Sequence, residues 1–401
     1  GMNQPVRQRP ARAVLSGFCA TFVGIGLARF AYTPLLPAII DAHWFSASDA
    51  AYLGAANLAG YLLGALGASR LAKRFEARDV IRGMMLLTSI SLAACAWPLD
   101  FIWFCAWRLV SGLTGGALMV LAAPAVLPCI SPGRRGLASG IIFMGVGVGI
   151  AASGVLVPLF LVHGLASTWL LLGGLSLGLT AIAWRDWPGP AAAARAPLED
   201  RPGSGWHARR QLHLLCAQYA LNAAGLVPHM IFLVVFIANG LGQGLAVGSH
   251  YWTAFGLGAI AGPVLAGSLA DRIGYQKAIR IGLAIQTVAV AIPAIAPGAP
   301  SLLVSSVVMG AFTPGVVPLV LGRIQEMLSH RSIAERTAAW SVATTCFAVL
   351  QALSAYVLSY LLDATGSYAL LFGIAAAAVL GALVIDLVAS ASTSAHRSAR
   401  S

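Results

Sequence analysis

The sequence predicts an all-α membrane protein with twelve transmembrane helices in two pseudo-symmetric six-helix bundles, and with both termini on the cytoplasmic side. Three observations support this fold class. First, 59% of the 401 residues are hydrophobic and only 9% are charged, whereas a soluble protein carries roughly 25% charged residues. Second, twelve apolar stretches are long enough to span a bilayer. Third, the basic residues fall almost entirely in the connections of one side.

The apolar stretches set the expected helices, because a spanning helix needs about 20 apolar residues. They are too long and too evenly apolar for barrel strands, which have ~10 residues of alternating polarity. The first stretch is too long for a cleaved signal sequence and is followed by further spans. The predicted spans cover residues 13–40, 48–69, 79–98, 101–129, 136–162, 165–184, 211–238, 246–270, 277–297, 300–328, 337–362 and 367–389.

The connections between the spans predict the orientation. All but two of the 25 lysines and arginines lie in the terminal segments or in the even-numbered connections, and the other connections contain acidic residues instead (Asp41, Asp49, Asp100 and Asp363). Because basic loops stay cytoplasmic, we expect a multi-pass protein of the bacterial inner membrane with both termini inside. The net charge of +12 is then an orientation signal, and we expect no nucleic-acid partner.

A segment rich in proline, alanine and charge divides the spans into two groups of six. The predicted order is a cytoplasmic tail (1–12), an N-terminal six-helix bundle (13–184), a cytoplasmic linker (185–210), a C-terminal six-helix bundle (211–389) and a second tail (390–401). Parallel halves of this kind are typical of transporters, in which the substrate site lies near mid-membrane between the halves.

Motifs at repeated places identify a family resemblance. The connection after the eighth span, Gly267-x-x-x-Asp271-Arg272-x-Gly274, resembles the loop motif of the major facilitator superfamily. The corresponding connection in the first half is basic, and the resemblance implies a gating role for both segments. The basic residues of the first copy are Arg70, Lys73 and Arg74.

Two further segments extend the resemblance over nearly the whole chain. Arg108-x-x-Ser111-Gly112 is similar to the superfamily's fourth-span motif, whose arginine is implicated in coupling. The first-span segment Gly24–Pro37 is similar to the YbfB/YjiJ-type bacterial members. The resemblance implies the major facilitator fold and transport by alternating access.

Two arginines inside predicted spans indicate the type of substrate. Counted from the outer helix ends at about 1.5 Å per residue, Arg29 lies roughly 16 Å deep and Arg108 roughly 10 Å deep. Charged side chains at such depth are costly and usually face the bundle interior or a water-filled cavity. No Asp or Glu lies at mid-depth in any span, and guanidinium binds carboxylates in bidentate fashion. We therefore predict an organic anion as the substrate, with Tyr32 on the same helix face as Arg29. Alternatively, Arg108 binds backbone carbonyls of neighbouring spans, and Arg29 snorkels or forms local hydrogen bonds.

Polar residues in other spans are further candidates. His229 lies well inside the seventh span and, with Arg108, is a candidate for proton coupling, since imidazole gains a proton near physiological pH. Alternatively, His229 donates to a carbonyl freed by Pro228. The remaining candidate substrate contacts are also typical of hydrogen bonds between membrane helices; they are Asn57, Tyr61, Tyr219, Asn222 and Gln351.

Small residues and prolines suggest how the helices pack. Glycines four residues apart allow close helix approach, and prolines within spans are expected to bend them. The glycine pairs are Gly60/Gly64, Gly112/Gly116, Gly145/Gly149 and Gly258/Gly262. The six cysteines lie in apolar stretches and are expected to be buried hydrophobic residues.

Together these features predict a secondary active transporter of a small organic anion, coupled to protons by symport or antiport or working by exchange. We find no Walker loop, metal-ligand cluster or nucleophile–base pair, and so expect no enzyme activity, no cofactor and no metal. The expected partners are the solute and the lipid bilayer, and we expect a monomer. One alternative is efflux of hydrophobic drug-like compounds. An alternative of another class is a non-transporting membrane sensor or scaffold.

Overall fold

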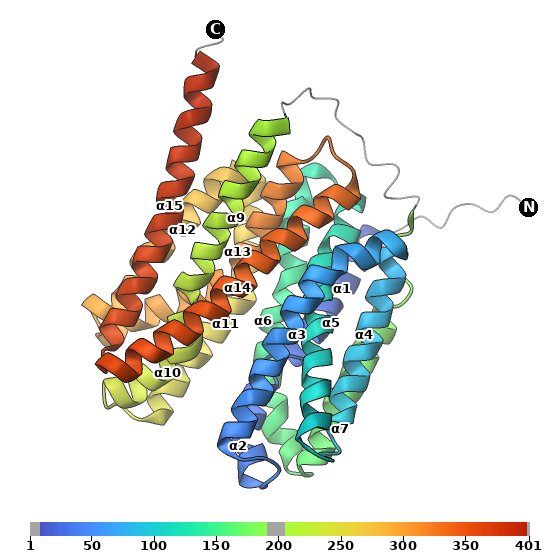
Figure 1. The fold of residues 1–401 in the computed structure, drawn as a ribbon, viewed down its shortest axis with the longest axis vertical. Coiled ribbons are helices and arrows are strands. Elements are labelled where there is room, and N and C mark those ends of the chain that lie inside the picture. Colours follow the sequence, from blue (N-terminus) through green and yellow to red (C-terminus); the bar gives the residue numbers. More distant parts are fainter. Residues whose placement is uncertain (1–8, 191–204, 399–401) are drawn as a thin grey trace, which may run out of the picture. The chain divides into compact units, whose positions relative to one another are not determined.

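The computed structural model describes residues 9–190 and 205–398, which form helices and turns without any strand. The chain divides into two compact units, Gly1–Leu198 and Glu199–Ser401. This division falls within the linker expected at 185–210. In each unit the long helices run alongside one another (Figure 1).

The first unit contains seven α-helices, one π-helix and two short 3₁₀ turns among its described residues. Helices α3 and α4 both pack on α5, α4 also packs on α7, and α1 packs on α6. Side chains that accept from the first turn cap two of these helices, Ser46 before α3 and Asp100 before α5. In order, the elements are α1 (Pro10–Thr21), η1 (Phe22–Leu27), α2 (Tyr32–Asp41), α3 (Ala47–Arg74), α4 (Ala77–Ala94), α5 (Phe101–Val126), η2 (Leu127–Cys129), η3 (Pro132–Arg134), α6 (Arg135–Leu161) and α7 (Leu165–Ala183).

The second unit repeats this packing. Helices α11 and α12 pack on α13, α12 packs on α15, and α9 packs on α14, so each pair has a counterpart in the first unit. In order, the elements are α9 (Gly205–Val227), η4 (Pro228–Phe232), α10 (Leu233–Val235), η5 (Phe236–Gly240), α11 (Leu245–Ile273), α12 (Tyr275–Ile295), α13 (Ala299–Met327), α14 (Ile333–Thr365) and α15 (Tyr368–Ser398).

Ten helical segments of the described chain are long and apolar enough to cross a membrane. The other two predicted spans, 48–69 and 79–98, correspond to α3 and α4, which are helical but are not among the ten. Helix α3 is rich in alanine and glycine, and α4 begins with charged residues. Multiple apolar helices are therefore established, and twelve spans with cytoplasmic termini stay a prediction.

The first span of each unit is interrupted, whereas we expected one continuous helix over 13–40 and another over 211–238. In the first unit the π-helix η1 is followed by a turn at residues 28–31 before α2 begins. Pro34 has no N–H to donate to the Phe30 carbonyl, which disfavours a continuous helix here. In the second unit Pro228 begins the π-helix η4. Such π-helical segments are frequent at functional sites.

The structure confirms close helix approach at the predicted glycine pairs. A Cβ atom at Gly64 on α3 would lie 2.0 Å from the Leu113 carbonyl oxygen of α5, and one at Gly262 on α11 would lie 2.0 Å from the Ala311 carbonyl oxygen of α13. Any larger residue would force these backbones apart.

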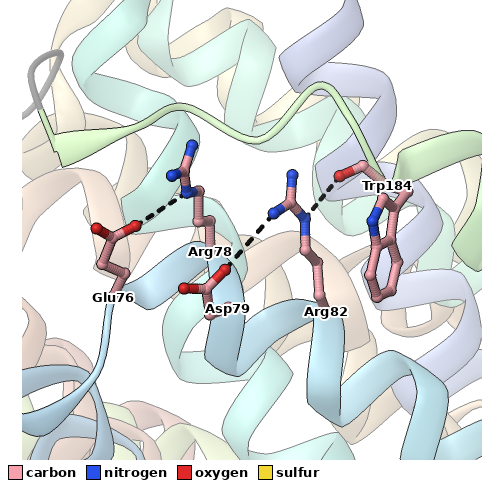
Figure 2. A network of polar contacts seen from close by, with 5 residues as sticks. All are labelled: Glu76, Arg78, Asp79, Arg82 and Trp184. Atoms are coloured by element: carbon pink, nitrogen blue, oxygen red, sulfur yellow. Dashed lines mark hydrogen bonds and ion pairs between the residues drawn. The ribbon is translucent and has the colours of Figure 1, made fainter.

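A network of polar contacts connects the start of α4 with Trp184, the residue that follows α7 (Figure 2). Arg82 Nε donates to the Trp184 carbonyl at 2.7 Å, and the Arg82 guanidinium lies over the Trp184 ring at 5.4 Å. Arg82 also pairs with Asp79 at 3.5 Å, and Arg78 pairs with Glu76 at 3.0 Å. The carbonyls at a helix C-terminus carry partial negative charge, so a guanidinium is a suitable cap for α7.

The second unit has a corresponding contact between α12 and α15. Arg280 Nε lies 2.7 Å from Asp386 Oδ2, and the Asp386 side chain is only 8% exposed. Arg280 also donates to the Ser390 hydroxyl. Some of the arginines that predict the orientation of the chain therefore also join helices within each unit.

Candidate functional site

Arg108 ties α5 to the break in the first span. Its side chain is buried, with 2% of the residue exposed. Nη1 donates to the Ala28 carbonyl at 2.9 Å, and the guanidinium lies over the Tyr32 ring at 4.3 Å. Within the described part of the chain, Nε has no hydrogen-bond partner. This bond to a backbone carbonyl matches the structural alternative for Arg108.

Asn57 joins three segments at the same place. Its Nδ2 donates to Ser111 Oγ at 2.9 Å and to the carbonyls of Arg108 and Ala28 at 3.4 and 3.5 Å. The Ser111 hydroxyl donates in turn to the Arg108 carbonyl at 2.8 Å. Asn57 therefore links α3 with α5 and with the turn that follows η1, as expected of a polar residue between membrane helices.

Arg29 is the next residue after Ala28 and is half-buried. Its guanidinium carbon lies 5.5 Å from the centroid of the Phe30 ring and 5.6 Å from that of the buried Tyr61 ring. Such cation–π contacts contribute about 0.5–2 kcal/mol, depending on how dry the site is. The Tyr32 hydroxyl donates to the Ala50 carbonyl of α3 at 2.5 Å. Both arginines are thus held beside one break in the first span.

The first unit therefore brings five predicted site residues together. Tyr61 contacts Arg29, Tyr32 contacts Arg108, and Asn57 bonds to the Arg108 carbonyl. Arg108 donates to the Ala28 carbonyl, Arg29 follows Ala28 in the chain, and Arg108 forms no ion pair with any residue that the structure describes.

His229, in η4, is fully buried in the second unit. Its Nε2 lies 2.7 Å from Ser305 Oγ, and the Ser305 hydroxyl donates to the Ala289 carbonyl at 2.6 Å. Since serine has one proton, Nε2 must carry the hydrogen that it shares with Ser305. Nδ1 is then the unprotonated nitrogen, and it has no partner in the described chain. The hydrogen-bond partner of His229 is therefore Ser305. The alternative that we considered was a backbone carbonyl freed by Pro228.

The other candidates of the second unit form separate contacts. Tyr219 stacks on Trp340 with ring centroids 6.0 Å apart, and it contacts Phe347 at 4.5 Å, both on α14. Gln351 Nε2 lies 3.4 Å from the sulfur of Met230. Asn222 is buried. These contacts do not join Tyr219 to His229, and a substrate-binding role for all three residues stays a prediction.

The predicted gating segments lie at corresponding helix ends. Asp271 and Arg272 are in the last turn of α11, and Gly274 separates α11 from α12 with φ of +90°, a conformation that favours glycine. Gly267 lies buried in α11. The counterparts in the last turns of α3 are exposed cations that suit the negative end of a helix; they are Arg70, Lys73 and Arg74.

Sequence reasoning missed the partners that hold these groups. Ser305 is one of several small polar residues within spans, and nothing in the sequence singles it out. The Ala28 carbonyl becomes an acceptor only because the helix breaks there. No group of three or more His, Cys, Asp or Glu side chains that could hold a metal occurs within residues 9–190 and 205–398.

The fold is that of membrane transporters of the major facilitator superfamily. The human organic anion transporter TETRAN has 16% identity and a TM-score of 0.76, with 96% of this chain and 100% of that chain covered. A bacterial homologue of the iron transporter ferroportin has 15% identity and a TM-score of 0.72, with 96% and 100% covered. The Escherichia coli fucose:proton symporter FucP has 15% identity and a TM-score of 0.69, with 94% and 98% covered. At these identities the likeness shows the fold alone.

The family model described as "Uncharacterised MFS-type transporter YbfB" matches residues 21–387. The chain therefore belongs to the YbfB-type family of major facilitator transporters, which confirms the resemblance of the first span. A search of curated proteins gives no match.

Proposed function

We propose that the chain is a secondary active transporter that moves a small organic anion, with a carboxylate as its charged group, across the bacterial inner membrane by alternating access. Proton coupling or exchange would supply the energy. The observation that carries this proposal is the presence of two arginines, Arg29 and Arg108, at the interrupted first span, where Arg108 donates to the Ala28 carbonyl and Arg29 lies over the Phe30 ring.

The electrostatics of this pair favour a negatively charged solute. Moving a charge into the membrane interior is costly, and here the first unit holds two arginines within predicted spans. A carbonyl and an aromatic ring stabilise Arg108 without neutralising it. The N–H donors of a guanidinium match a carboxylate in bidentate geometry. A bound carboxylate would supply the neutralising charge.

The two arginines take different roles in this proposal. Arg29 is half-buried and binds the anion directly, with Phe30 and Tyr61 restricting its side chain. Arg108 is enclosed and acts as a positioning residue that fixes the Ala28 carbonyl and adds positive potential. The other proposed solute contacts are Tyr32, Asn57, Tyr219, Asn222 and Gln351. The proposed coupling residue is His229.

The functions of proteins with the same fold are compatible with the proposal. One solved structure of this fold is a human organic anion transporter, and another is a fucose:proton symporter. The chain belongs to a family of transporters, which supports transport as its activity. The choice of an anion depends on the two guanidiniums of this chain and not on those relatives.

A thermal-shift screen tests the proposal. Purified protein is heated with a panel of carboxylate metabolites and with their neutral amide analogues. A ligand at 100 times its Kd stabilises the folded state by about 2.7 kcal/mol, so at least one carboxylate should raise the Tm while its amide should not. Arg29→Gln should abolish this shift, and Arg331→Gln, an exposed arginine before α14, should retain it.

Four outcomes would contradict the proposal. Equal shifts with carboxylates and amides would remove the role of charge. An unchanged carboxylate shift in Arg29→Gln would remove Arg29 as the contact. Stabilisation by neutral hydrophobic compounds alone would favour drug efflux, and ligand binding without flux in proteoliposomes would favour a sensor.

A further inference from the structure

We propose that the interior of four helices in the second unit holds a chain of ordered waters. This chain carries protons between His229 and the end of the unit where Arg280 pairs with Asp386. The inference rests on the proton-coupled form of the proposed function, and it assigns a proton route within the C-terminal half.

The same four helices surround both ends of this route. At one end α9, α12, α13 and α15 line a small cavity of about 20 Å³ that is partly open to solvent; its polar lining is Gln211, Gln218, Gln276, Arg323 and Asp386. At the other end His229, in the continuation of α9, contacts Ser305 of α13 and Phe372 of α15. Ser305 bonds in turn to the Ala289 carbonyl of α12.

Buried polar side chains lie between the two ends. Gln218 and Asn222 are four residues apart in α9 and so share one helix face, and His229 follows in η4. At about 1.5 Å per residue they extend over roughly 16 Å. Gln286 lies on α12, one turn before Ala289. Their exposed fractions are only 5% for Gln218, 2% for Asn222, 0% for His229 and 1% for Gln286.

Each of these four side chains has a buried polar atom without a hydrogen-bond partner among the residues that the structure describes. These atoms are Gln218 Nε2, Asn222 Oδ1, Gln286 Oε1 and His229 Nδ1. One is a donor and three are acceptors, and water satisfies both kinds. Buried polar atoms nearly always have a protein or water partner, and a buried water makes about three hydrogen bonds. Ordered water molecules beside these side chains would provide partners for all four atoms.

The hydrogen bonds of His229 determine where a proton is taken up. The Ser305 hydroxyl proton is committed to the Ala289 carbonyl, so Nε2 keeps its own hydrogen on Ser305. A hydronium ion in the chain therefore gives its proton to Nδ1, which forms imidazolium and leaves a water molecule. Release returns the proton from Nδ1 to water, and the Ser305 bonds are unchanged throughout.

Charged side chains of the surrounding helices lie toward the cavity end of the route. The titratable group nearest to His229 on α15 is Tyr368, one turn before Phe372 and in contact with Phe236. The charged residues described there are Arg209 and Arg210 on α9, Lys277 and Arg280 on α12, Arg323 and Glu326 on α13, and Asp386 on α15. Protons would enter at this end because its cavity is partly open to solvent.

Hydrogen–deuterium exchange at the C2 position of histidine, followed residue by residue with mass spectrometry, tests the inference. This exchange requires water at the imidazole ring, and the pH dependence of its rate reports protonation of the ring. In the purified full chain we expect His229 to exchange within about tenfold of the rate of exposed His213. In the double variant Gln218→Leu/Gln286→Leu the His229 rate should fall by about tenfold or more, whereas His213 and His250 should be unaffected.

Two controls keep this test specific. Thr287→Val changes a neighbour of Gln286 that bonds to its own helix, at the Leu283 carbonyl, and it should leave His229 exchange unchanged. If the double variant does not fold, Gln286→Met alone should slow exchange at His229. No measurable exchange at His229 in the unmodified chain, or equal exchange in the folded variants, would overturn the water chain. Neither result depends on a transported anion, so the anion proposal stands or fails separately in the thermal-shift screen.

Discussion

At the residue scale, buried guanidiniums are held by a backbone carbonyl and aromatic rings. Arg108 lies between the Ala28 carbonyl and the Tyr32 ring, and Arg29 lies beside Tyr61. A buried charged group is expensive unless it is hydrogen-bonded, so these contacts make the positive charge tolerable. They do not cancel it, and a carboxylate would therefore be attracted to this place.

Substitutions of Arg108 should separate its positioning role from its charge. Arg108→Met removes the bond to the Ala28 carbonyl, and hydrogen bonds from charged groups contribute about 1.5–3 kcal/mol. We expect Arg108→Met to lower the Tm of the purified protein, and Arg108→Lys, which retains one donor, to lower it less. The Tm of each variant is measured in detergent by heating samples and quantifying the folded protein that remains with size-exclusion chromatography. Equal Tm values for Arg108→Met and the unmodified protein would contradict the positioning role.

The sequence identifies the groups at the site more readily than their partners. Arg29, Arg108 and His229 stand out because ionisable residues are rare within apolar runs. Their hydrogen-bond partners depend on tertiary structure: the Ala28 carbonyl is an acceptor only where the helix breaks, and Ser305 comes from a distant helix. Ser111 was visible as part of a motif, but its bond with Asn57 was not.

At the element scale, each unit begins with a helix that changes from α to π geometry, at η1 and at η4. Hydropathy cannot show such a change, because an apolar run is equally apolar on both sides of it. Glycine spacing is different, since it predicted close helix approach, which the structure has between α3 and α5 and between α11 and α13. A sequence therefore reveals helix contacts made by small residues better than it reveals breaks within a helix.

Alanine substitutions within α3 should show the cost of losing this close approach. A Cβ at Gly64 would lie 2.0 Å from a backbone oxygen of α5, whereas one at Gly67 would meet no atom within 4 Å. Overpacking typically costs about 1–3 kcal/mol, and alanine is intrinsically more stable than glycine in a helix by about 0.5–1 kcal/mol. We expect Gly64→Ala to lower the Tm and Gly67→Ala to maintain or raise it.

The comparison can be repeated in the second unit. Gly262→Ala should be destabilising because of the Ala311 carbonyl, and Gly256→Ala should be tolerated. If Gly64→Ala were as stable as Gly67→Ala in the same detergent, the close packing of α3 on α5 would be wrong.

At the scale of the whole molecule, hydropathy and the distribution of basic residues determine the predicted architecture. Both are properties of long stretches and tolerate local errors, which is why the helical fold was predicted correctly, whereas the family was recognised from short motifs. Helices α3 and α4 are the exception, because they are helical but less apolar than the ten clear candidates. The twelve-span orientation therefore depends on the charges at their ends.

Labelling of single introduced cysteines should settle this orientation. With twelve spans, Arg70→Cys in the last turns of α3 lies inside and Asp100→Cys before α5 lies outside. We expect a membrane-impermeant maleimide to label Asp100→Cys in intact cells, and Arg70→Cys only after lysis, with the parent chain as the background for its native cysteines. If α3 and α4 did not cross the membrane, Arg70→Cys would also be labelled in intact cells.

Transport itself provides the most direct test of the central claim. Uptake of the carboxylate that gives the largest thermal shift is measured in proteoliposomes with equal amounts of incorporated protein. The loss of a charged hydrogen bond of about 1.5–3 kcal/mol predicts that Arg29→Gln reduces uptake by about tenfold or more. Arg29→Lys should be impaired as well, since lysine lacks the bidentate geometry. Undiminished uptake by both variants would contradict an anion bound at Arg29.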